Sequence, residues 1–202
     1  MCLEWKKRLV CGGFAILIAL GSTKFLVDAK EQRVQEKLSK EVFRFHVIAN
    51  SDSEKDQKLK LDVKERVISY MEEQLPESEN VTMTQKWAVS HIGEIEGIAM
   101  ETLRQQGCEM QVRASVTKVY FPDKTYGDIT FPKGEYDALR IEIGEAKGQN
   151  WWCVLYPNLC FLDAVHAVVP EEGKEELRNV LDKEAYEMVT ALSRFRIGWF
   201  FF

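Results

Sequence analysis

A short segment, residues 43–57, brings a histidine, a serine and carboxylates together in the sequence FRFHVIANSDSEKDQ. In a hydrolase, His46 could serve as acid or base together with Asp52 or Asp56. Such catalysis requires His46 to lie within hydrogen-bond reach of a nucleophile. Ser51 is the nearest hydroxyl, but it opens an S-x-x-E pattern, which is typical of a helix cap. The segment therefore predicts a strand-to-helix junction in preference to a catalytic triad.

The sequence contains none of the short motifs that mark common catalytic or cofactor sites. It has no H-E-x-x-H metal pattern, no G-x-S-x-G nucleophile elbow and no glycine loop of the phosphate- or dinucleotide-binding kind. His91 and His166 lie among helical or apolar residues, and we interpret both as structural. We therefore expect no catalytic residue, no metal site and no cofactor. The net charge of -5 argues against a general nucleic-acid binder.

The N-terminus has the composition of an export segment. Basic residues 6–8 precede an unbroken apolar run over residues 9–20. This pattern fits a secretory signal peptide, and an uncleaved membrane anchor stays open as the alternative because apolar residues continue beyond the run. We expect residues 1–29 to be this signal or anchor and residues 30–41 to be a polar linker or helix. Residues 42–202 would then form a single globular extracytoplasmic domain.

The cysteine pattern suggests one disulfide in an exported domain, where such bonds can persist. Cys153 and Cys160 flank Pro157, a turn former, in the stretch WWCVLYPNLCF. We expect a Cys153–Cys160 bridge, and two buried free thiols are the alternative. Cys108 is left without a partner.

Hydrophobic periodicity predicts an α+β fold with a mostly antiparallel sheet and amphipathic helices packed on it, preceded by the export segment. The strands should occupy residues 42–49, 110–121, 129–131, 136–143 and 151–156. The helices should run from Ser51 to the residue before Pro76, from about residue 82 to near Gly107, and over residues 175–195. We expect residues 136–143 and 151–156 to pair as a hairpin. The strand order is left open.

Several polar and aromatic residues of the predicted strands are candidates for contact with a partner. Arg44 and His46 point to the same strand face, whereas Trp151 and Trp152 point to opposite faces. One tryptophan should belong to the core, and the other should be either an exposed anchor or covered by the C-terminal helix. The candidate partner-binding residues are Arg44, His46, Asn50, Asp52, Trp151 and Trp152.

Two long stretches resemble a known family. FRFHVIANSDSEKDQKLKLDVK and KTYGDITFPKGEYDALRIEIGEAKGQNWWCVLYPNLCF, together with the export segment, are similar to the stage II sporulation protein R family, most clearly over residues 42–165. The resemblance implies a signalling protein that is not an enzyme. It would be exported by the secretion machinery into the space between the forespore and mother-cell membranes, secreted or membrane-anchored. There it would activate a membrane-bound aspartic protease, stage II sporulation protein GA, which processes the sigma-E precursor. The alternative is an extracytoplasmic hydrolase, acting on cell wall or peptide, that uses His46 with Asp52 or Asp56.

Overall fold

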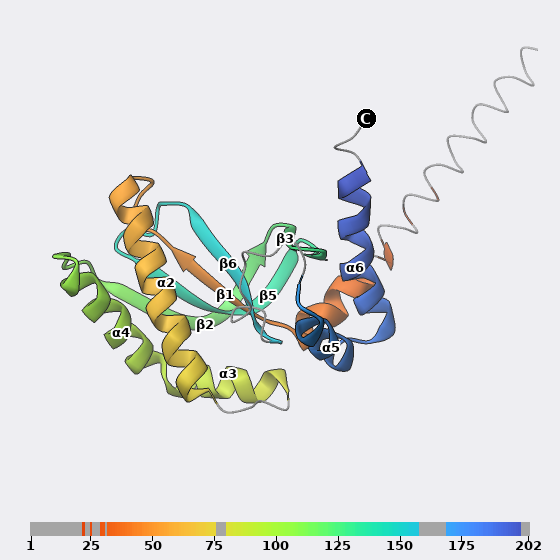
Figure 1. Ribbon diagram of the computed structural model, residues 1–202, viewed down its shortest axis with the longest axis horizontal. Coiled ribbons are helices and arrows are strands. Elements are labelled where there is room, and N and C mark those ends of the chain that lie inside the picture. The colour runs from red at the N-terminus through yellow and green to blue at the C-terminus, as the bar shows by residue number, and fades with distance from the viewer. Residues whose placement is uncertain are drawn as a thin grey trace, which may run out of the picture.

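The structure, a computed structural model, describes residues 32–75, 80–157 and 169–198 together with Ser22, Phe25, Ala29 and Lys30, with side chains placed as far as residue 191. Residues 32–41 are helical. Eleven further elements follow (Figure 1): β1 (Phe43–Ile48), α2 (Glu54–Gln74), α3 (Val81–Ser90), α4 (Ile92–Gln105), β2 (Val112–Phe121), β3 (Lys124–Tyr126), β4 (Ile129–Phe131), β5 (Gly134–Ile143), β6 (Asn150–Tyr156), α5 (Glu171–Val180) and α6 (Lys183–Gly198). Most of the expected signal or anchor lies outside the described residues, and none of the helices within them is both long and apolar enough to cross a membrane.

The predicted fold class is confirmed at the level of an α+β fold with a mostly antiparallel sheet. Among the described residues the main sheet has four strands in the order β2-β5-β1-β6. β1 runs parallel to β5 and antiparallel to β6, and β2 runs antiparallel to β5. The short strands β3 and β4 pair with each other in a separate hairpin.

The predicted hairpin between β5 and β6 is wrong, because β1 lies between them. All six residues of β1 are buried, including the polar ones, so this strand needs neighbours on both edges and cover on both faces. The turn after β5 therefore passes over the end of β1. There Gly148 N donates to Ala49 O at 2.9 Å, and Ala49 N donates to Gln149 O at 3.4 Å.

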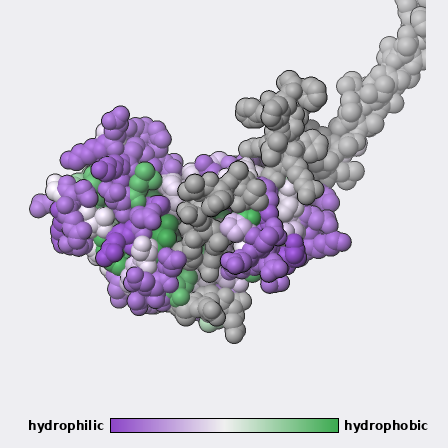
Figure 2. Space-filling model, viewed as in Figure 1, coloured by the Kyte–Doolittle hydropathy of each residue, from purple (hydrophilic) through white to green (hydrophobic). Residues whose placement is uncertain are grey.

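One face of the sheet is covered by α2, α3 and α4 (Figure 1). Phe43, Phe45 and Val47 of β1 point to this side and are fully buried. The predicted apolar stripe of α2 meets them with four buried residues one turn apart, Leu59, Val63, Val67 and Met71. Each large apolar side chain buried in this way contributes about 1.5–3 kcal/mol. The outer surface over these helices is mostly hydrophilic (Figure 2), as expected for amphipathic helices.

A second core lies on the other side of the sheet, at the end where β3, α5 and α6 are seen in Figure 1. It joins residues of the sheet, of the β3–β4 hairpin and of the last two helices, among them Phe121, Phe131, Tyr136, Val154, Leu177 and Ala185. Val34 and Leu38 are also fully buried in it. Buried packing therefore starts before residue 42, although we expected the globular domain to begin at that residue.

The periodicity predicted two long helices where the structure has two pairs. The first is divided at His91, whose φ of -111° and ψ of 16° are not helical and whose ring Nδ1 lies 2.8 Å from Trp87 O. This placement agrees with the structural role expected for His91. The last helix is divided before α6, where Asp182 Oδ1 accepts from Ala185 N at 2.8 Å and so starts a new helix.

The helix ends follow capping chemistry only partly as predicted. Asn80 caps α3, slightly before the predicted start at about residue 82, because its side chain accepts from Met83 N at 3.1 Å. Gly107 is confirmed as the residue that ends α4, with a φ of +69°. Cys108 N then donates to Leu103 O at 2.9 Å, which closes the helix.

Candidate functional site

The junction between β1 and α2 is capped by Ser53, and the cap predicted at Ser51 is wrong. Asp56 N donates to Ser53 Oγ at 3.2 Å, and Glu54 is the first residue of α2. Ser51 instead donates its hydroxyl to Asp56 Oδ2 and accepts from Ser53 N at 3.2 Å. Two serines two residues apart offered competing caps, and the one adjacent to the helix is used.

Asp56 is the centre of this junction. Its Oδ2 accepts from both the Ser51 hydroxyl and Asn50 Nδ2, the latter at 2.8 Å. These two hydrogen bonds, first that of Ser51 and then that of Asn50, lower the pKa of Asp56 because they stabilise the charged form. Asp56 is therefore an anionic structural group that holds the residues before the helix in place.

Asn50 connects the junction to the turn between β5 and β6. Its Oδ1 accepts from Glu145 N at 2.9 Å, and its backbone oxygen accepts from Lys147 N at 3.1 Å. The turn approaches so closely that a Cβ at Gly148 would collide with Ser51 O. The polar stretch after β1 and the glycine-rich turn after β5 thus form one hydrogen-bonded unit.

A buried lysine completes this unit from the side of α2. Lys60 Nζ donates to Gln57 Oε1 at 2.6 Å and to Gln149 O at 3.2 Å. Burial lowers the pKa of Lys60. Gln57 Nε2 in turn donates to Ser51 O at 2.8 Å, so α2 is joined to both sides of the junction.

His46 does not meet either carboxylate that the hydrolase hypothesis assigned to it. Its Nε2 lies 2.7 Å from Asn150 Oδ1, which can only accept, so Nε2 carries the proton. Burial lowers the pKa of His46 to about 4, which leaves the ring neutral at pH 7. Asp56 bonds to other residues and Asp52 is exposed. This geometry does not assemble the acid–base pair that the hydrolase would need.

Arg44 is one of the candidate partner-binding residues, but its side chain is fully buried. Nε donates to Cys153 O and Nη2 to the Tyr126 hydroxyl, both at 3.1 Å. The guanidinium carbon lies within 4.3–5.9 Å of four ring centroids, those of Phe121, Tyr126, Phe131 and Tyr136. A desolvated cation–π contact is worth about 2 kcal/mol, and here four rings share a single guanidinium. Arg44 joins the sheet to the β3–β4 hairpin, and is unavailable to a partner.

His46 is buried for a related reason, since only 3% of its surface is exposed. Its ring stacks on Trp152, with centroids 3.8 Å apart. Alternation along β1 correctly put Arg44 and His46 on one face. It could not reveal that β3–β4 and Trp152 cover that face.

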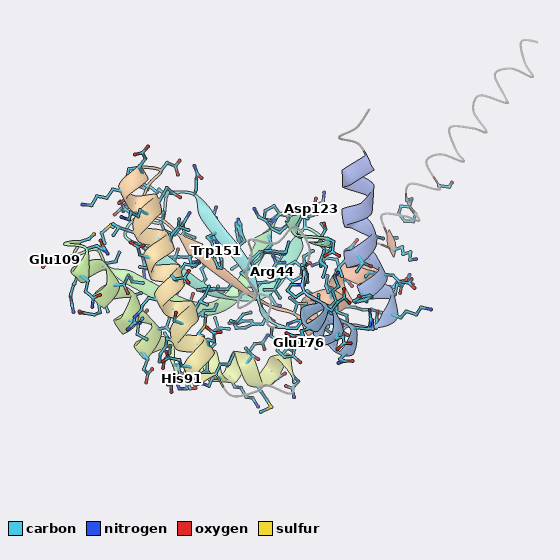
Figure 3. All side chains as sticks on the ribbon, viewed as in Figure 1. Arg44, His91, Glu109, Asp123, Trp151 and Glu176 are labelled. Carbon is cyan, nitrogen blue, oxygen red and sulfur yellow. The ribbon has the colours of Figure 1, made fainter. Side chains whose placement is uncertain are left out.

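The two tryptophans point to opposite faces of β6, as predicted, and both are half-buried. Trp151, labelled with Arg44 in Figure 3, packs edge-on against Phe45 at a centroid distance of 5.6 Å, on the side of α2. Lys64 Nζ lies 5.3 Å from the Trp151 ring centroid. Trp152 faces the other way, where Lys124 Nζ lies 5.9 Å from its ring centroid. Neither tryptophan is a fully exposed side chain, and the ring of each is in cation–π contact with a lysine.

A partly exposed polar surface lies on the second sheet face, beyond the second core. We call it the open sheet face and define it by six half-buried or exposed residues, Arg113, Ser115, Arg140, Glu142, Asn150 and Trp152. They are neighbours by register, since Arg140 is paired with both His46 and Ser115, and Glu142 with Arg113. Arg140 Nη2 also donates to Glu142 Oε1 at 2.8 Å. Arg113, Arg140 and Glu142 were not among the candidates predicted from the sequence, although their alternation with apolar residues was a usable signal.

The cysteines differ from the expected pattern. Cys153 is a free buried thiol in the structure, where we expected one half of a bridge, and Cys160 lies outside the described residues. Cys153 points into the core beside α2, with 5% of its surface exposed. Cys108 is also free and lines a surface depression of about 330 Å³ beside Met100 and Arg104. Within the described residues, no cluster of His, Cys, Asp and Glu is arranged to hold a metal ion. His166 lies outside them.

Comparisons with known proteins give a consistent result. The family model described as stage II sporulation protein R matches residues 39–166, the span from the end of the first helical segment through β6 and beyond. The stage II sporulation protein R of Bacillus subtilis (strain 168) is 34% identical over 194 residues, which cover 92% of this chain and 85% of that protein. No solved structure matches the chain. The chain therefore belongs to the stage II sporulation protein R family.

Proposed function

We propose that this protein is an exported signal that activates a membrane-bound aspartic protease by direct contact during sporulation. The protease would be stage II sporulation protein GA of the mother cell, and its substrate the sigma-E precursor. The observation that carries the proposal is family membership, with a match over residues 39–166 and 34% identity along 92% of the chain. A role in sporulation follows from the family itself. Activation of the protease is the more specific function that we propose.

The chemistry of the site supports recognition better than catalysis. His46 is neutral and bonded to an amide, while Asp56 is held by Asn50 and a serine hydroxyl. A general acid or base works best when its pKa lies near the operating pH, and the pKa of His46 lies far below neutrality. The groups that remain accessible are those that bind partners, namely a half-buried tryptophan, an amide and arginines on the open sheet face.

Burial changes which of the candidate residues we assign to contact. Arg44 and His46 support the surface from beneath, whereas Asn150, Trp152 and the exposed Asp52 can be reached by another protein. Trp151 lies on the opposite sheet face, beside α2. We therefore assign partner contact to the open sheet face and its neighbouring edge.

Co-expression in a non-sporulating bacterium tests the proposal. The full chain, the membrane-bound protease and the sigma-E precursor are produced together, and the shortening of the precursor is followed by immunoblot. We expect processing only when all three are present, and none when residues 1–29 are deleted or when the protease carries a substituted catalytic aspartate. Equal processing with and without the full chain would reject activation.

A further inference from the structure

We propose that the outer edge of β6 at Asn150–Trp152 is a docking site for an extended, acidic segment of the partner, which adds to the sheet as a further strand. The inference rests on the proposed function, because the partner in question is the membrane-bound protease. It adds the mode of contact, which is pairing of backbones at a sheet edge.

The register of β6 leaves backbone groups free at this edge. Ala49 N donates to Gln149 O, so Ala49 and Gln149 are a hydrogen-bonded pair of the antiparallel ladder. Hydrogen-bonded pairs alternate along such a ladder, and the backbone N–H and C=O of Trp151, two residues further on, therefore also face β1. Those of Asn150 and Trp152 then point away from the sheet. Within the described residues, no backbone hydrogen bond beyond the sheet involves either residue. An incoming strand would find donors and acceptors at regular spacing.

At the opposite edge of the sheet, formed by β2, a backbone donor is already occupied. There Glu96 from α4 accepts from Ala114 N at 2.7 Å, so a side chain occupies a backbone donor of β2. Exposed sheet edges pair readily with other chains unless they are blocked in some such way. Only the β2 edge carries this block among the described residues. The contrast favours β6 as the edge left open for a partner.

The charges beside β6 favour an acidic partner segment. Lys124 Nζ lies over the Trp152 ring, and no carboxylate within the described residues forms an ion pair with it. The adjoining open sheet face contains Arg113 and Arg140 against the single carboxylate of Glu142. An acidic side chain of the incoming strand would reach Lys124, which lies over the ring of β6 itself. Arg140 on β5 and Arg113 on β2 lie two and three strands further into the sheet, and they add only to the positive charge of this face. A second copy of this chain would bring the same cations together, which disfavours self-pairing.

Photo-cross-linking during co-expression with the protease tests the docking site. p-Benzoylphenylalanine is placed in the full chain at Trp152, which keeps an aromatic ring on β6. The matched control carries it at Tyr120 of β2, which is 60% exposed. We expect an adduct with the protease from position 152 and none from position 120. An adduct with a second copy of this chain, or none from position 152 while processing continues, would overturn the inference.

Charge reversal tests the acidic character of the partner segment. Lys124→Glu should lower precursor processing about tenfold, the effect of losing one favourable charge contact of moderate strength. Lys86→Glu on α3, at an exposed position, should leave processing unchanged. Thermal melts of both variants should match that of the unsubstituted chain, and equal processing by both would reject the charge assignment. An adduct at position 152 without any processing would keep the docking site and reject activation, so the two proposals fail separately.

Discussion

His46 and Trp152 lie directly opposite each other in the β1–β6 ladder and stack with ring centroids 3.8 Å apart and planes 14° from parallel. Phe121 flanks both rings, at centroid distances of 5.9 Å and 4.6 Å. The imidazole is therefore held between aromatic surfaces, with Asn150 as its hydrogen-bond partner. A residue that resembled a catalytic base in the sequence serves to support the tryptophan above it.

Stability should fall on mild acidification because of His46. Its pKa is lowered by burial from 6.5 to about 4, so between these values the unfolded chain binds more protons than the folded one. The stability that depends on a neutral His46 ring is fully present above pH 6.5 and is lost as the pH falls toward 4. Between pH 7 and pH 4.5 this group alone should cost about 2 kcal/mol of unfolding free energy, measured by urea denaturation. His46→Gln should show a shallower dependence, and an equal slope would contradict the assignment.

Removing the aromatic cover should restore an ordinary titration to His46. In Trp152→Ala the ring becomes accessible to water, so the pKa of His46 should rise from about 4 toward 6.5. Proton NMR of the histidine ring as a function of pH measures this shift. Trp151→Ala is the matched control, since Trp151 lies on the opposite face of β6 and should leave the titration unchanged. A similar shift in both variants would indicate general loosening of the strand.

Asn50→Ala should destabilise the protein by about 1–3 kcal/mol, because it removes a donor to Asp56 and leaves Glu145 N without its acceptor. Asp52→Ala, two residues away and exposed, should change the unfolding free energy by less than about 0.5 kcal/mol. Chemical denaturation of the two variants side by side gives the comparison. Equal stability of both would mean that the junction does not depend on the Asn50 side chain.

Gly148→Ala should be strongly destabilising, since the new methyl group would collide with Ser51 O and the Ala49 side chain. Neither backbone can move away without breaking the hydrogen bonds of the turn, so a loss of about 1–3 kcal/mol is expected. Gly97→Ala in α4 is the control. Nothing lies within 4 Å of its new Cβ, and this variant should be more stable by about 0.5–1 kcal/mol. Thermal melts that rank the two variants in the opposite order would contradict this account of the turn.

Cys153 should behave as a free thiol. Alkylation in denaturant without reductant, followed by peptide mass spectrometry, should label Cys153 fully, because the structure leaves it unbridged. In the native protein the same reagent should label Cys108 faster, since Cys153 is buried. Protection of Cys153 that disappears on reduction would instead restore the bridge to Cys160 expected from the sequence.

Local patterns along the chain predicted where the helices and strands lie better than they predicted which strands pair. The stripe of Val63, Val67 and Met71 identified α2, and Gly107 was recognised as the end of α4, because both signals depend on neighbours within one or two turns. The break at His91 was missed because apolar spacing continues across it. The β5–β6 hairpin was wrong because two strands joined by a short turn usually pair, and a distant strand took the place between them.

The sequence by itself determined the family, the fold class and the strand-to-helix junction after β1, since these follow from long motifs, periodicity and local polar chemistry. Only the tertiary structure decided what Arg44 and His46 do. Alternation assigns a side chain to a sheet face, but it cannot tell whether that face is covered. The aromatic rings around Arg44 come from β2, β3, β4 and β5, and the ring stacked on His46 comes from β6. Their burial is a property of residues up to about a hundred positions away, which no local pattern contains.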